Sequence, residues 1–134
     1  MWRMHRSFAI LALSCALGAW ATSPAASLKD RTLPFGCADI VVIGMLKNDV
    51  DSYEHVEIPN DILGHGWMRA DLHVRKVVKG LDVPASLPVR YFGHTYFRED
   101  RDFMFVVSGN GRKGYKIKTA QLMEVRPRLA SRCG

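Results

Sequence analysis

The sequence predicts an all-β fold, a small antiparallel barrel of five to six strands, and three observations support this. Apolar residues recur with a period near two along most of the chain, which is typical of strands. Gly and Pro interrupt these segments at short intervals. No capped amphipathic stretch of helical length occurs, apart from a turn or two near Asp61 and near Arg128. A barrel suits many short strands because it closes its own edges.

Five segments carry the strand pattern. The first is a nearly continuous apolar run broken by Gly44, which indicates burial on both faces or a bulge. The second alternates until Lys76-Val77-Val78, where we expect a bulge or a bend. The acidic stretch 47–66 is expected to be a loop, with a short strand around 55–58 as an alternative. The predicted strands are 39–46, 67–78, 87–92, 102–107 and 114–119, followed by a short segment at 121–125.

The start of the chain has the pattern of a secretory signal peptide. Basic residues precede an apolar run from Phe8 to Trp20, and small residues lead to a cleavage site expected after Ala21. Cleavage as late as Ala26 and an uncleaved anchor are the alternatives. We therefore expect residues 1–21 to be a signal peptide, 22–36 a flexible N-terminus and 37–134 one barrel domain. The protein is expected in the periplasm or outside the cell.

The cysteines that remain after signal cleavage predict one disulfide. Cleavage removes Cys15 and leaves Cys37 and Cys133, an even pair in an oxidising compartment. We predict a disulfide between them, with two free thiols as the alternative. Closing so long a loop restricts the unfolded chain by roughly 4 to 5 kcal/mol on the entropic model.

Charge is unevenly distributed along the chain. Of the formal net charge of +6, Arg3 and Arg6 leave with the leader, so a mature chain carries +4. Six acids lie between residues 39 and 61, and seven bases lie between residues 112 and 134. The basic stretch predicts contact with an anionic polymer or an acidic partner, and an ordinary solvated face is the alternative. The candidate polyanion-binding residues are Arg112, Lys113, Lys116 and Lys118.

A second candidate surface is aromatic. Arginines are interleaved with it, and aromatic rings with arginines on a barrel face can stack bases or sugars and hold phosphates. The alternative is that half of the rings point into the core. The four aromatic residues are Tyr91, Phe92, Tyr96 and Phe97.

Catalytic and cofactor motifs are not found in the sequence. Residues 109–114 match G-x-G-x-x-G, but an alternating segment follows instead of a helix, so we expect a hairpin. The acidic loop has carboxylates and histidines without metal-site spacing, and Ser108 lacks a nucleophile elbow. We expect no cofactor, no metal and no enzymatic activity.

Four segments together resemble a known family: CADIVVIGML from Cys37, ADLHVRKVVKG from Ala70, PVRYF from Pro88 and DRDFMFVV from Asp100. They look like the exported bacterial relatives of the netrin-like, metalloproteinase-inhibitor-like domain. The resemblance covers most of the mature chain and implies an OB-like barrel. In the inhibitors of that group, an N-terminal cysteine binds the target's zinc through its free amine, whereas Cys37 lies inside the expected mature chain. The resemblance therefore implies a fold more than an activity.

These observations predict an exported, non-catalytic binding or accessory module. The first hypothesis is recognition of a protein partner in the envelope or outside the cell, through a barrel face or the 47–66 loop. The second is binding of an anionic polymer or lipid through the basic C-terminal third, and intracellular nucleic acid is not expected. The third is a metal-dependent hydrolase, which requires Asp51, His55 and His65 to converge. The sequence leaves the oligomeric state open.

Overall fold

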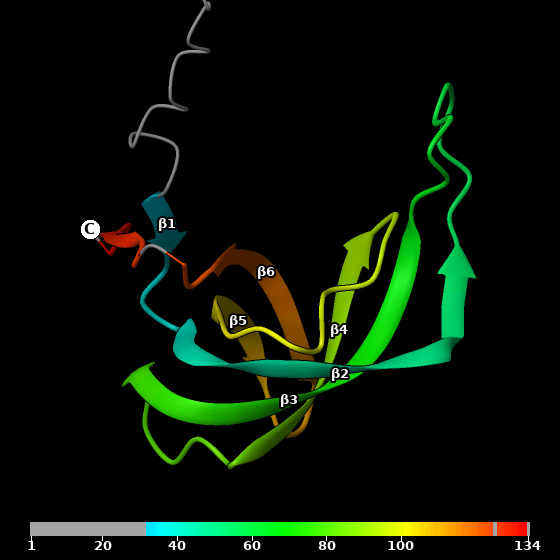
Figure 1. Cartoon of the computed structure of the whole chain (residues 1–134). Helices are drawn as coiled ribbons and strands as arrows, with labels where there is room; N and C mark the ends of the chain where they lie inside the picture. The colour runs from blue at the N-terminus through cyan, green and yellow to red at the C-terminus, as the bar shows by residue number, and fades with distance from the viewer. Residues whose placement is uncertain (1–31, 125, 134) are drawn as a thin grey trace, which may run out of the picture.

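The computed structural model describes residues 32–124 and 126–133, and every regular element in these ranges is a β-strand (Figure 1). The predicted signal peptide and most of the predicted flexible N-terminus lie outside the described residues. No helix in the described ranges is long and apolar enough to cross a membrane. The strands are β1 (Thr32–Phe35), β2 (Ile40–His55), β3 (Gly66–Lys79), β4 (Ser86–Gly93), β5 (Phe103–Asn110), β6 (Gly114–Leu122) and β7 (Arg128–Ser131).

Five of these strands form a closed barrel in the order β2-β3-β4-β6-β5. β5 closes the barrel by pairing antiparallel with β2, and the only parallel pair in the ring joins β4 to β6. The predicted all-β barrel is confirmed, with this one exception to its antiparallel character. The strand order is compatible with an OB-like fold.

Two of the three register shifts in the β2–β3 pair lie close together. They fall between Val41 and Val42 and between Ile43 and Gly44, and they leave Val78 and Arg75 of β3 as the extra residues. A Cβ atom at Gly44 would collide with the carbonyl oxygen of His73, so only glycine fits where the two strands approach. The bulge or bend predicted at these positions is confirmed.

The barrel interior is filled by side chains that alternate inward from all five strands. Phe97, which lies between β4 and β5, adds a ring to this core and packs edge-on against Tyr91 at 5.0 Å, Phe103 at 5.3 Å and Phe105 at 5.8 Å between ring centroids. The buried members of the cluster are Val42, Leu46, Met68, Ala70, Leu72, Leu87, Val89, Tyr91, Phe105, Val107 and Ile117.

Outside the barrel, β1 and β7 form a separate two-stranded parallel sheet. Leu33 of β1 packs with Val41, Met104 and Val106 in a second buried cluster on the barrel wall. β1 lies in the segment 22–36, for which the sequence predicts a flexible N-terminus. β7 is a strand where the sequence allows a helical turn near Arg128, because its backbone pairs with β1.

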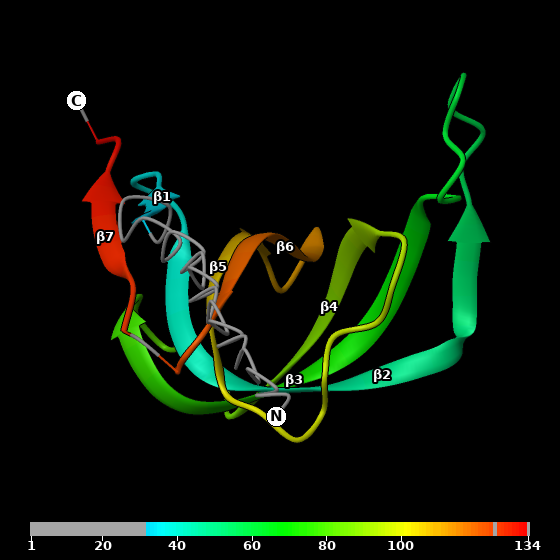
Figure 2. The same cartoon turned by 45° about the horizontal axis from the view of Figure 1, so that its top comes forward.

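β2 continues to His55, well beyond the predicted end at residue 46, so the loop between β2 and β3 comprises only residues 56–65. The predicted loop 47–66 is therefore too long. The side chain of Ser52 explains part of this extension, because its Oγ donates to the carbonyl of Asp49 at 2.6 Å and accepts from the backbone amide of Arg69 at 2.8 Å. Figures 1 and 2 show the 56–65 loop projecting from the side of the molecule opposite β1 and β7.

Candidate functional site

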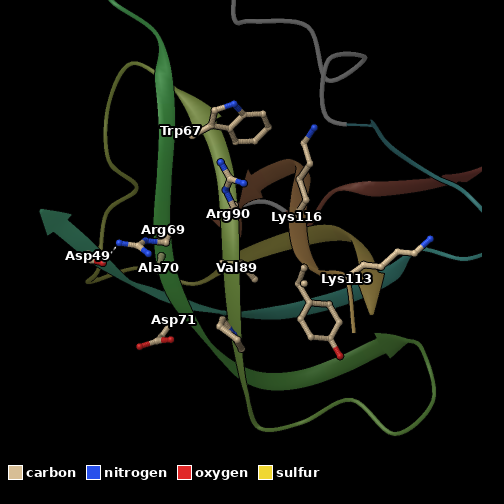
Figure 3. Close-up of a pocket in the computed structure, with 12 residues that line it drawn as sticks. Asp49, Trp67, Arg69, Ala70, Asp71, Val89, Arg90, Lys113 and Lys116 are labelled. Atoms are coloured by element: carbon tan, nitrogen blue, oxygen red, sulfur yellow. Dashed lines mark ion pairs between the residues drawn. The ribbon is translucent and has the colours of Figure 1, made fainter. Parts of the chain in front are cut away.

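A groove of about 580 Å³ runs over the outer face of β3, β4 and β6 (Figure 3). Ala70 and Val89 form its floor together with neighbouring backbone. The side chains of these two residues belong to the barrel core. Its walls carry charged and aromatic side chains from the outward-facing positions of the same strands. We call this feature the basic groove. Its polar and aromatic lining is Asp49, Trp67, Arg69, Asp71, Arg90, Lys113, Lys116 and Tyr115, the last of which also packs against the barrel core.

Strand register brings three cations into one row across the basic groove. Arg69 of β3 pairs with Arg90 of β4 in the antiparallel ladder, and Arg90 pairs with Lys116 of β6 in the parallel ladder. All three residues are exposed. Like charges directly opposite each other on adjacent strands destabilise a sheet, so the row by itself adds no stability to the β3–β4–β6 pairing.

Trp67 lies to one side of the row, two residues before Arg69 on β3, and contacts two of the three cations. The Arg90 guanidinium carbon is 4.9 Å and the Lys116 Nζ is 4.7 Å from the centroid of the indole ring, as Figure 3 shows for the side chains. The edge of Phe92 contacts the same ring at 5.2 Å between centroids. The site therefore combines a flat apolar surface with positive charges that border it.

Two carboxylates form exposed ion pairs with the two arginines of the row. Asp49 is 3.6 Å from Arg69, and Glu54 is 3.6 Å from Arg90, and all four side chains are about half exposed or more. Such surface ion pairs contribute little energy and open readily. Within residues 32–124 and 126–133, no carboxylate lies within 4.0 Å of the Lys116 ammonium.

The structure separates the four bases that the sequence singles out. Arg112 and Lys113 lie in the β5–β6 hairpin turn, where Asn110 Oδ1 accepts both of their backbone amides at 3.0 Å. The glycine-rich motif is thus a hairpin, as predicted, with Asn110 paired to Gly114. Lys113 and Lys116 line the basic groove, whereas Lys118 contacts Asp39 elsewhere.

The four aromatic residues do not form one surface. Tyr91 is buried and donates its hydroxyl to Asn48 Oδ1 at 2.7 Å, and burial raises the pKa of Tyr91 to about 12. Phe97 lies in the core cluster. Phe92 and Tyr96 are exposed, and Tyr96 donates its hydroxyl to the carbonyl of Val50 at 2.9 Å. Only Phe92 is placed to extend the aromatic side of the basic groove.

The acidic region contains no catalytic metal centre in the described ranges. No group of three or more His, Cys, Asp or Glu side chains there is arranged to hold a metal ion, and this includes Asp51, His55 and His65. The hydrolase hypothesis therefore gains no support from the described part of the chain. The 56–65 loop instead exposes apolar side chains, with Ile62 95% and Leu63 61% accessible.

A different set of contacts joins the first and last parts of the described region. Cys37 and Cys133 form the predicted disulfide, with their Cα atoms 5.1 Å apart. Nearby, Lys118 Nζ contacts the buried Asp39 carboxylate at 2.7 Å, and Lys79 Nζ donates to the carbonyls of Cys37 and Asp39 at 2.7 Å each. Together with β1 and β7, these contacts form what we call the terminal clamp.

The charge state of Asp39 follows from its contacts. Burial would raise the pKa of its carboxyl, but hydrogen bonds from Lys118 and from the Gly36 amide, with the charges of Lys118 and Lys79, outweigh burial. The pKa of Asp39 therefore lies below its usual range, and the ion pair is intact at neutral pH.

Sequence reasoning did not assign Trp67, Arg69 and Arg90 to one site. The available signal was their position on the polar side of alternating strands, at 67 and 69 in one strand and at 90 in the next. Which residues become neighbours depends on strand register and on the parallel β4–β6 contact.

In comparisons with known proteins, no family model, no curated protein and no solved structure matches the chain. The site is therefore interpreted from its own geometry.

Proposed function

We propose that this protein is a non-catalytic binding module and that the basic groove holds an anionic polymer. The observation that supports this most directly is the row Arg69–Arg90–Lys116 beside Trp67. A chain of phosphate, sulfate or carboxylate groups would place its anions along the row. Its sugar or other flat repeating unit would stack on the indole ring.

Energetics favour a ligand over a purely structural role for the row. Adjacent like charges cost the sheet a few tenths of a kcal/mol up to about 1 kcal/mol, and an anion bound between them removes that cost. Arg69 and Arg90 each offer a planar set of donors that matches phosphate or carboxylate oxygens. Lys113 adds a fourth cation from the hairpin.

The position of the groove on the barrel supports the same proposal. In OB-like barrels, oligonucleotides and oligosaccharides bind on the face of the second and third strands, beside the loops that join strands one and two and strands four and five. Here that face is β3 and β4, and the β5–β6 hairpin carries Lys113. The OB-like assignment and the kinship with the netrin-like domain remain part of the proposal.

The cellular setting of the proposal is the envelope or the extracellular space. A disulfide between Cys37 and Cys133 is consistent with an exported protein. Polysaccharides and anionic polymers of the cell surface fit this setting better than intracellular nucleic acid does.

The test is a binding titration with dextran sulfate and with polyphosphate, using neutral dextran as the control polymer. With four cations engaged, the logarithm of the affinity should fall with the logarithm of salt concentration with a slope of about −3. R90S/K116S should bind at least about tenfold more weakly, with the slope reduced to about −1.5. K47S/K76S removes the same charge from exposed positions outside the groove and should bind like the wild type. Equal binding by R90S/K116S and the wild type would rule out the groove.

A protein partner at the 56–65 loop is the second candidate. It rests on the exposure of Ile58, Ile62 and Leu63, three apolar side chains on one projecting loop. A specific partner should co-purify with the wild type and with R90S/K116S but not with I62S/L63S. Co-purification that is unchanged in I62S/L63S would remove this candidate.

A further inference from the structure

Two histidines face each other just beyond the end of the β3–β4 ladder. The last backbone pair joins Gly66 to Gly93, so His65 and His94 occupy the next cross-strand position. His65 Nε2 lies 3.3 Å from His94 Nδ1, and the two ring planes meet at 75° with centroids 4.9 Å apart. The backbone ladder therefore brings two imidazole nitrogens together on a partly solvent-accessible surface.

The carboxylate of Asp61 fixes His65 from the other side. Both carboxylate oxygens lie 2.9 Å from His65 Nδ1, and they also accept the backbone amides of Leu63, Gly64 and His65. A carboxylate that already accepts three backbone amides offers only acceptor oxygens to the imidazole. In the neutral form of the ring, His65 Nδ1 therefore carries the proton, and the lone pair of Nε2 is directed toward His94.

The ring of His65 is also held by packing. It stacks on Phe92 with the planes 17° apart and the centroids at 5.6 Å. The Asp61 side chain is 8% exposed and that of His65 is 30% exposed, so the carboxylate is covered while part of the imidazole ring is accessible to solvent. Such a carboxylate–imidazole arrangement is the usual support behind a histidine that binds a metal, because it fixes the tautomer and increases the basicity of the other nitrogen.

The distance between the two nitrogens fits a metal ion. Zinc binds imidazole nitrogen at about 2.0–2.1 Å with tetrahedral geometry, which places two such nitrogens about 3.3–3.4 Å apart. Imidazole suits zinc, copper and nickel better than it suits magnesium or calcium. The alternative is a long N–H···N hydrogen bond between the rings, and the two arrangements predict different responses to added zinc.

We propose that His65 Nε2 and His94 Nδ1 bind one Zn²⁺ ion, with Asp61 orienting His65 from behind. In the described ranges no third side chain is placed to complete the coordination, so the remaining positions take water or a group from another molecule. The site is independent of the polymer-binding proposal, because neither histidine lines the basic groove. The proposed role of the site is to bind the ion, and no reaction is proposed for it.

The test is titration of the full, oxidised chain with Zn²⁺ in competition with a chromophoric chelator. The wild type should bind one equivalent, and H65A/H94A should bind at least about tenfold more weakly, since losing a ligand costs no less than losing its supporting partner. The matched control is H55A/H73A, which removes every other histidine that follows the expected signal peptide and should bind like the wild type. Equal affinity of the wild type and H65A/H94A would overturn the proposal.

Three further measurements keep the proposal testable if H65A/H94A folds poorly. H94A changes an exposed residue after the end of β4 and should lose zinc affinity while its thermal unfolding without metal stays near that of the wild type. D61N should weaken binding by roughly 10- to 100-fold. In NMR spectra, Zn²⁺ should shift the ring resonances of His65 and His94, and shifts confined to the other histidines would refute the site.

Discussion

Lys116 and Lys118 stand two residues apart on β6, and both side chains point out of the barrel, yet they belong to two different regions. Lys118 lies in the terminal clamp, 2.7 Å from a carboxylate whose side chain is only 7% exposed. Lys116 lies in the basic groove, beside Trp67 and in register with Arg90. The comparison teaches that the same residue type on one strand can serve the fold in one place and leave its charge available in another.

The terminal clamp should account for the largest effect on stability. C37S/C133S is expected to lower the free energy of unfolding by about 4 kcal/mol, because the bridge closes a loop with a sequence separation of 96 residues. Chemical denaturation of both proteins measures the change, and wild type treated with reductant should match the variant. A loss below about 1 kcal/mol would show that the clamp does not depend on the disulfide. Polymer affinity of the folded variant should not change.

The ion pair of the clamp should give the next largest effect. K118M is expected to lower the free energy of unfolding by about 2 kcal/mol, because Asp39 keeps its burial and loses a charged hydrogen-bond partner. Denaturation at neutral pH measures it. Polymer binding by K118M should equal that of the wild type, and a binding loss would mean that Lys118 belongs to the groove after all.

Acid should reduce the difference between K118M and the wild type. The folded-state pKa of Asp39 in the wild type is below its usual value, so its contribution to stability is complete above about pH 4 and is lost as the pH falls through the lowered pKa. Without Lys118, only the Gly36 amide and the charge of Lys79 oppose burial, so the pKa of Asp39 is lowered less and the variant loses less stability in acid than the wild type does. Unfolding free energies measured from pH 7 down to pH 3 should converge, and a constant difference would contradict this account.

The smallest stability effect is expected in the basic groove. K116M should change the free energy of unfolding by no more than about 0.5 kcal/mol, because the lost cation–π contact with Trp67 is offset by relief of repulsion from Arg90. The same variant should bind dextran sulfate several-fold more weakly. Thermal unfolding and the polymer titration together check the contrast with K118M. A large stability loss in K116M would identify Lys116 as a structural residue.

The sequence predicts the barrel strands well because their signal is local. Alternation between buried and exposed positions marks β3 and β4, and Gly44 marks the bend in β2. The disulfide follows from cysteine count and the expected compartment, without any knowledge of distance. The end of β2 is missed because its last residues are acidic and polar, and their strand conformation depends on pairing with β3.

The features that the sequence does not reveal are contacts between distant segments. β1 and β7 are only four residues long, which is too short to show a hydrophobic period. Each strand is stabilised by pairing with the other, although they are far apart in the sequence. Arg69, Arg90 and Lys116 become neighbours only after strand order and register are fixed. The facing pair His65–His94 depends in the same way on where the β3–β4 ladder ends.

The disulfide also determines how the molecule responds to mechanical force. Tension applied at the two ends of the chain would pass from the segment before Cys37 through the sulfur bridge to Cys133. All five barrel strands lie between these two cysteines in the sequence, so they are outside the path of the load. A protein tethered by one end and pulled by the other would keep its barrel folded until the bridge itself is reduced.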